Sequence, residues 1–212
     1  MTPIKKFFVF LFSVSALLLT MLSCSTVPML NINYKVLEKT NLLEGKRVLL
    51  EIRDSRQDKD IFGEGAKEDF QNASETISLS IAEGNEKGFK VGIFPLTDLM
   101  RQVFEERFKS LGISVVTDKN KTGEEPRIVI DLKAFKLELI KGTIKRTWKS
   151  SMIYGVEISS KGKVLTATTI TGQSEKLKII GRTDADSLVS DLVTDLVNRL
   201  DVQALLKQAG LV

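Results

Sequence analysis

The chain has 212 residues, enough for one domain with a substantial hydrophobic core. It carries 31 lysines and arginines against 27 acids, a formal net charge of +4, with one cysteine and no histidine. The missing histidine removes the commonest general base and the commonest metal ligand, and a single cysteine excludes an internal disulfide.

The first 23 residues resemble the signal peptide of an exported bacterial lipoprotein. Lys5 and Lys6 form a basic start, an apolar run with interspersed serines follows, and Ser23 precedes Cys24. The run is shorter than the roughly 20 apolar residues that span a bilayer. The pattern therefore predicts cleavage before Cys24 and lipid on its thiol. Loss of the two lysines leaves a nearly neutral chain, and export makes nucleic acid an unsuitable partner.

The predicted lipid would hold the protein to a membrane. Stable attachment generally needs two acyl chains, and a diacylglyceryl group with an N-acyl chain meets that need. Residue 25 is serine rather than the aspartate that retains lipoproteins at the inner membrane, which indicates the outer membrane. We expect a signal peptide over 1–23, a lipidated tether over 24–44 and a single folded domain over 45–212.

Several apolar patterns in the first half predict strands. The tether has no sustained period apart from a short extended piece near 32–34. Residues 47–52 are almost continuously apolar, which suits a central strand, whereas 57–74 are polar and predict a loop. Residues 77–81 and 89–93 alternate on either side of a glycine-bounded turn and predict a β-hairpin.

A helix is expected from about residue 96 to residue 111, with Gly112 just past its end. Its apolar residues recur at spacings of three and four and share one face. They are Leu96, Leu99, Met100, Val103, Phe104, Phe108 and Leu111. Residues 113–116 then form a short strand.

Three long strands follow, joined by two turns. A tight turn at Ser160–Lys163 would pair these two residues directly and set Tyr154 opposite Thr169 on one face. Ile158 would then face Leu165, and Val156 would face Ala167.

The preceding turn is expected at Lys141–Gly142, which would set Trp148 opposite Phe135 and Ile144 opposite Leu139. Continuing this register would place an apolar residue against Asp131. A β-bulge near Lys133–Ala134 removes the mismatch, with Met152 then opposite Ile130 and Tyr154 opposite Ile128.

The chain closes with a capping-box pattern at Thr183–Asp186, a long amphipathic helix and a short helix over 201–208. The apolar stripe of the long helix is Leu188, Val189, Leu192, Val193, Leu196, Val197 and Leu200. The element order predicts an α+β fold: a mostly antiparallel sheet with a long three-strand meander and two main helices packed on one face.

These features together resemble the YajG family of bacterial lipoproteins from about Lys46 to the end. The matching points are Cys24, the strand that runs into Asp54-Ser55-Arg56, and the helix entry Phe94-Pro95-Leu96-Thr97-Asp98-Leu99. The meander and the amphipathic C-terminal helix match as well. The resemblance implies an envelope lipoprotein that binds or assists another envelope component, and it carries over no catalytic residue.

Asp54 and Arg56 form the first candidate site, at a strand end. Side chains two apart in an extended chain point the same way, so the two could grip a partner together. The alternative is an internal ion pair or turn cap that fixes the loop.

A basic cluster surrounds one hairpin of the meander and forms the second candidate. It consists of Lys133, Lys136, Lys141, Lys145, Arg146 and Lys149. These residues could meet anionic lipid headgroups or acidic glycan. Alternatively, they solvate exposed strands and block edge pairing, with Trp148 on the inward face.

The loop before the hairpin is acidic. Its carboxylates are Asp58, Asp60, Glu64, Glu68 and Asp69, without the spacing of a calcium loop or a phosphate loop. No metal or cofactor is expected, and nothing places two acids for glycoside hydrolysis. We predict a non-enzymatic envelope lipoprotein that binds an envelope protein or assists an assembly or transport machine. The alternative is a lipid- or glycan-binding carrier or sensor.

Overall fold

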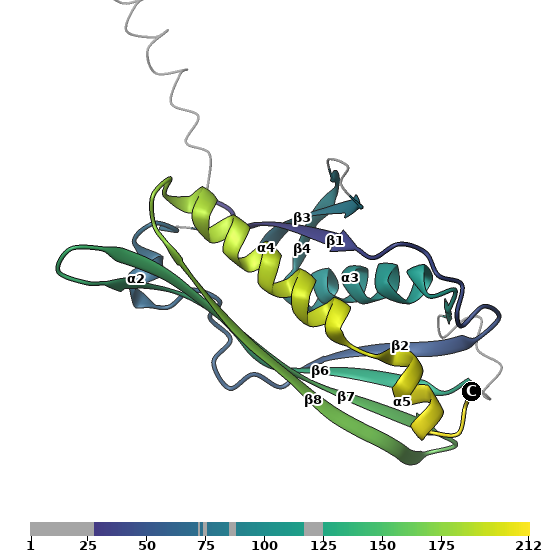
Figure 1. Cartoon of the computed structure of the whole chain (residues 1–212). Coiled ribbons are helices and arrows are strands. Elements are labelled where there is room, and N and C mark those ends of the chain that lie inside the picture. Colours follow the sequence, from purple (N-terminus) through teal and green to yellow (C-terminus); the bar gives the residue numbers. More distant parts are fainter. Residues whose placement is uncertain (1–27, 72, 74–75, 85–87, 117–124) are drawn as a thin grey trace, which may run out of the picture.

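A computed structural model of the protein describes residues 28–71, 73, 76–84, 88–116 and 125–212 (Figure 1). The strands are β1 Asn31–Val36, β2 Arg47–Asp54, β3 Thr76–Glu83, β4 Phe89–Pro95, β5 Ser114–Val116, β6 Arg127–Lys141, β7 Arg146–Ser160 and β8 Lys163–Leu177. The helices are α2 Glu64–Lys67, α3 Leu96–Ser110, α4 Arg182–Arg199 and α5 Val202–Gln208. The predicted signal peptide and Cys24 lie outside the described residues.

The strands form two sheets. The larger has the order β5-β2-β6-β7-β8, and the smaller has the order β1-β3-β4. The α+β class, the β3–β4 hairpin and the long antiparallel meander β6-β7-β8 are confirmed. The division into two sheets was not predicted, nor were the parallel pairings of β1 with β3 and of β2 with β5 and β6. The alternation of apolar and polar residues along the sequence identifies a strand, but it does not identify the strand that pairs with it.

Helices α3 and α4 pack on the larger sheet (Figure 1). The predicted apolar face of α3 is buried, and Gly112 follows its end with a positive φ of 84°. Between the helices and the sheet, Phe104 packs edge-on against Tyr154 with ring centroids 5.4 Å apart. Trp148 and Phe108 are also completely buried, so side chains fill this space.

The β6–β7 register differs from the prediction. Trp148 pairs with Leu139 rather than with Phe135, which faces Met152. Ile144 was expected opposite Leu139, but it lies in the turn, because both strands run on to Lys141 and Arg146 before the chain reverses. Since Phe135 and Leu139 are four residues apart, they share a face, and Trp148 still points inward. The bulge is confirmed between Leu132 and Ala134.

The Ser160–Lys163 pairing at the next turn is confirmed, but the register shifts beyond it. Ser159 pairs with Val164 and Ile158 pairs with Thr166, so Leu165 is an extra residue. One extra residue exchanges the two faces of the rest of β8. Tyr154 consequently faces Ile170 instead of Thr169, and Val156 faces Thr168 instead of Ala167.

The start of α4 also differs from the prediction. The helix begins at Arg182, and Gly181 at its N-cap offers no side chain. The carboxylate of Asp184 accepts the backbone N–H groups of Ile179 and Ile180 at 2.6 and 2.5 Å. These bonds lower the pKa of Asp184. The acids of the expected capping box therefore hold neighbouring segments rather than the helix's own first turn.

Strand β1 is bound along its outer edge by polar side chains of α4. The bonds run from Asn31 N to Asp186 Oδ1 at 2.9 Å, from Asn33 N to Ser190 Oγ at 2.9 Å, from Lys35 N to Thr194 Oγ1 at 3.2 Å, and from Asn198 Nδ2 to Lys35 O at 2.8 Å. Four helical residues rise about 6.0 Å and two strand residues about 6.6 Å, so the two spacings nearly match. We call this row of bonds the α4–β1 ladder.

The ladder begins at Asn31, seven positions after Cys24 in the sequence. The extended piece expected near 32–34 is part of β1, and Leu30, Ile32 and Tyr34 are buried. Their alternation with exposed or half-buried neighbours is typical of a strand with one face on the core. The folded domain thus begins near residue 30, within the stretch expected to be a tether.

Replacing Ser190 with alanine should lower the free energy of unfolding by about 1–3 kcal/mol, because the Asn33 N–H is left without an acceptor. Chemical denaturation of the two proteins measures the difference. Asp191→Ala, on an exposed position of the same helix, is the control and should change stability by about 0.5 kcal/mol or less. A Ser190→Ala loss no larger than that of the control would contradict the ladder.

Candidate functional site

The first candidate site lies just after β2, where the chain moves away from the neighbouring strand β6 and then contacts β6 again. Ser55 N donates to Leu132 O of β6 at 2.9 Å, which is the last contact before the chain leaves the sheet. It returns at Leu137, whose N–H donates to Ile61 O and whose carbonyl accepts from Gly63 N, both at 2.8 Å. Residues 56–60 therefore form a short excursion beside β6.

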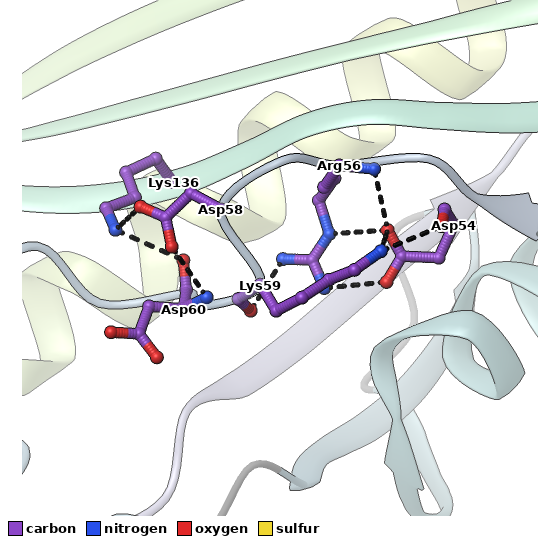
Figure 2. Close-up of polar contacts among 6 residues, drawn as sticks. All are labelled: Asp54, Arg56, Asp58, Lys59, Asp60 and Lys136. Atoms are coloured by element: carbon purple, nitrogen blue, oxygen red, sulfur yellow. Dashed lines mark hydrogen bonds and ion pairs between the residues drawn. The ribbon is translucent and has the colours of Figure 1, made fainter.

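Arg56 fills the inside of this excursion (Figure 2). Its Nε and Nη2 atoms donate to the two carboxylate oxygens of Asp54, each at 2.9 Å, and Nη1 donates to Lys59 O at 3.0 Å. Lys59 Nζ in turn donates to Asp54 O at 2.8 Å. The side chain of Arg56 is only 5% exposed. Asp54 and Arg56 thus form the internal ion pair that the sequence allowed as the structural alternative.

The same pair sets the ionisation of Asp54. The hydrogen bond from Arg56 lowers the pKa of Asp54 to about 2. The carboxylate therefore stays charged over the whole physiological range and accepts hydrogen bonds without acting as a proton donor. Its chemistry suits a fixed structural anion.

The acidic loop lies against the basic hairpin. Lys136 Nζ donates to Asp58 at 2.6 Å (Figure 2), and Lys67 pairs with Asp60 at 2.7 Å. Two further pairs join Lys141 to Glu68 and Lys178 to Asp69. Glu138 of β6 also accepts the backbone N–H of Gly65 in α2 at 2.8 Å. Two residues of the predicted basic cluster, Lys136 and Lys141, are thus paired with the acidic loop.

The excursion and α2 form one wall of an open cleft of about 780 Å³. Its floor is aromatic: Phe62 stacks on Phe70 with centroids 4.5 Å apart, and Phe70 meets Trp148 edge-on at 6.0 Å. The junction of β4 and α3, at Pro95 and Leu96, lines the opposite side. The volume lies in the range of pockets that enclose small ligands, about 300–1,000 Å³.

The rim of the cleft is charged. Lys59, Asp60 and Lys67 line it, and the side chains of Lys59 and Lys67 are 58% and 56% exposed. An apolar floor within a charged rim is the pattern of a protein-binding surface. Sequence reasoning missed this cleft, although Phe62 and Phe70 in a polar segment were a usable signal.

The remaining predicted basic residues separate into three places. Lys149 pairs with Glu175 across β7 and β8 at 3.2 Å. Lys133 is exposed on β6 beside Gly155 of β7. Lys145 and Arg146 are exposed at the β6–β7 turn, away from the cleft rim. The structure does not gather the predicted cluster into one surface.

Two further observations concern the whole described part of the chain. Within it, no group of three or more histidines, cysteines and acids is arranged to hold a metal ion. None of the helices that the structure describes combines the length and apolar character needed to cross a bilayer.

Three solved structures of bacterial proteins are similar to this chain. A protein of the DUF330 family from Xanthomonas campestris is 10% identical, with a TM-score of 0.53 over 86% of this chain and 96% of that chain. Rare lipoprotein B of Shewanella oneidensis is 11% identical, with a TM-score of 0.41 over 77% and 98%. A minor lipoprotein of Acinetobacter baumannii is 9% identical, with a TM-score of 0.39 over 75% and 92%.

The first of these likenesses shows a shared fold, and solved structures similar to this chain include bacterial lipoproteins. No protein-family model matches the sequence, and a search of curated proteins finds no match. The resemblance to the YajG family therefore stays a prediction.

Asp54→Asn should lower the free energy of unfolding by about 3 kcal/mol near neutral pH, because the buried Arg56 guanidinium loses its counter-charge. The loss should depend on pH. With a folded pKa of about 2 and an ordinary value of 3.8, the carboxylate stabilises the fold fully above about pH 4. This contribution disappears as the pH falls towards 2, so urea unfolding of wild type and variant should converge below about pH 4.

Asp58→Asn is the matched control, because this carboxylate also meets a lysine but is 64% exposed. Its loss of stability should be clearly smaller than that of Asp54→Asn, because exposed ion pairs contribute little to stability. Equal losses for the two variants at neutral pH would contradict a structural role for the Asp54–Arg56 pair.

Proposed function

We propose that the protein is a non-enzymatic cell-envelope lipoprotein, held by lipid on Cys24, whose domain binds an envelope protein through the cleft. The observation that carries the proposal is the lipobox-like Ser23-Cys24 only six residues before buried Leu30. A fold that begins so close to an acylated residue works at the membrane surface. Ser25 in place of aspartate supports the outer membrane, and the YajG resemblance supports an envelope lipoprotein.

The cleft supports a protein partner. Phe62 and Phe70 offer an apolar floor, which a partner side chain could fill, and Lys59 and Lys67 offer charged rim contacts. In protein interfaces a buried apolar centre supplies most of the affinity, and a polar rim surrounds it. In this arrangement Asp54 and Arg56 hold the wall of the cleft. Lys59 is bonded to Asp54 through Nζ, and its side chain, 58% exposed, lies where a partner would meet the rim.

A carrier of lipid or glycan is the second candidate, and the aromatic floor of the cleft favours it. Between the helices and the middle of the larger sheet, Phe104, Phe108 and Tyr154 fill the space. A second open cleft of about 770 Å³ lies between α3 and strands β2 and β5, but charged side chains such as Arg101 and Glu105 line it. An apolar ligand therefore suits the aromatic cleft better. Native mass spectrometry of protein purified from membranes distinguishes the two, since a carrier would retain a small ligand after removal of bound proteins.

Cys24→Ser should abolish lipidation, because a hydroxyl does not replace the thiol that receives the diacylglyceryl group. Metabolic labelling with a fatty-acid analogue should mark the wild type and leave the variant unmarked. The variant should also leave the membrane fraction. Equal labelling of both proteins, or labelling of neither, would contradict the proposal.

Partner binding can be tested with a photo-crosslinking amino acid placed at the cleft. Introduced at Lys59 or Lys67 in living cells, it should give a discrete adduct with an envelope protein. The matched control is exposed Lys207 in α5, which does not line the cleft and should give no such adduct. Absence of any adduct from the two cleft positions, or the same adduct from Lys207, would contradict docking at the cleft.

A further inference from the structure

Three isoleucines are the most exposed large apolar residues of the described chain. Ile144 in the β6–β7 turn is 98% exposed, and Ile179 and Ile180 between β8 and α4 are 80% and 71% exposed. The two loops are joined, because Lys178 N donates to Arg146 O at 3.0 Å. We call residues 140–146 and 177–182 together the anchor corner. Both loops lie on the same side of the molecule as the start of α4 (Figure 1).

The backbone under Ile179 and Ile180 is firmly held. Both N–H groups donate to the largely buried carboxylate of Asp184, and Trp148 Nε1 donates to Gly181 O at 3.1 Å. The two side chains point outward from a fixed loop, so their exposure does not come from local disorder. Exposed apolar side chains presented in this way mark an interaction surface.

The charge of the corner is positive. Lys145 and Arg146 are exposed beside Ile144, and neither makes a salt bridge to another described residue. By contrast, Lys141 and Lys178 are neutralised by Glu68 and Asp69. Apolar side chains flanked by free cations fit the interface of a bilayer that contains anionic lipid.

The length of chain before the fold decides which surface the corner meets. Leu30, which is buried, follows Cys24 by six positions, and a fully extended chain of that length reaches at most about 22 Å. The next residue, Asn31, is bonded to Asp186. Asp186 lies two positions, or about 3 Å of helix rise, from the Asp184 that holds the isoleucine loop. A lipid on Cys24 therefore keeps the bilayer beside the anchor corner.

We propose that the anchor corner docks on the anionic surface of the bilayer that holds the lipid. Ile144, Ile179 and Ile180 enter the headgroup–acyl boundary, and Lys145 and Arg146 contact the headgroups. The inference rests on the proposed lipidation of Cys24 and goes beyond it, since a lipid alone would leave the orientation of the domain free. Docking at this corner fixes which side of the domain faces the membrane.

Site-specific fluorescence tests this docking on the full lipidated protein. Because Cys24 is the only cysteine and its thiol would be acylated, an introduced Ile179→Cys or Ile144→Cys supplies the single free thiol for a polarity-sensitive dye. The labelled protein is reconstituted into vesicles of phosphatidylcholine with phosphatidylglycerol, with and without brominated acyl chains. Dyes at both positions should be quenched at least twofold by bromine, and less so without phosphatidylglycerol.

The control is Val164→Cys at the other end of the β7–β8 hairpin, where the side chain is 51% exposed. Its dye should not be quenched. Equal quenching at all three positions, or quenching at none while the protein floats with the vesicles, would overturn the docking proposal and leave lipidation intact. Failure to float, with no acyl mass on the N-terminal peptide, would overturn lipidation and docking together.

Discussion

The α4–β1 ladder is the contact on which the rest of the arrangement depends. It joins β1, the first described strand, to α4, the last long helix. The row of bonds begins with Asn31 and Asp186 and ends with Lys35 and Asn198. An edge strand with free backbone groups would invite pairing with other chains, and the side chains of α4 occupy that edge. The ladder also brings together two segments far apart in sequence: the chain that follows Cys24 and the loop before α4.

The second organising feature is the match between the acidic loop and the basic hairpin. Each pair is at least partly solvent-exposed, so each contributes modestly to stability. Together they hold residues 57–71 along β6 and keep Phe62 stacked on Phe70. This loop and the β4–α3 junction both line the cleft. Charge complementarity within the chain therefore shapes the candidate docking surface and neutralises Lys136 and Lys141 of the predicted basic cluster.

Periodicity predicted α3, α4, the β3–β4 hairpin and the three-strand meander, because each depends on a local apolar pattern. The bulge near Ala134 was also predictable, since an aspartate would otherwise face the core. The register was less accessible, because the turn residues alone do not give the length of the turn around Ile144 or the extra residue Leu165. Asp184 and Asp186 were assigned to a cap because the pattern does not reveal their actual partners, which are the preceding Ile179 loop and the distant Asn31. For the candidate site, the Asp54–Arg56 pair followed from strand geometry. The cleft needs the fold, because its walls lie more than twenty residues apart.

Hydrogen exchange at the amides of Asn33 and Lys35 tests the central claim most directly. If β1 is held between β3 and α4, both amides are bonded to helix side chains and should exchange only with global unfolding, at the same free energy as the core of β7. Exchange at the rate of an unprotected peptide would mean that this segment is a free tether. The fold would then start too far from Cys24 to set how the domain faces the membrane.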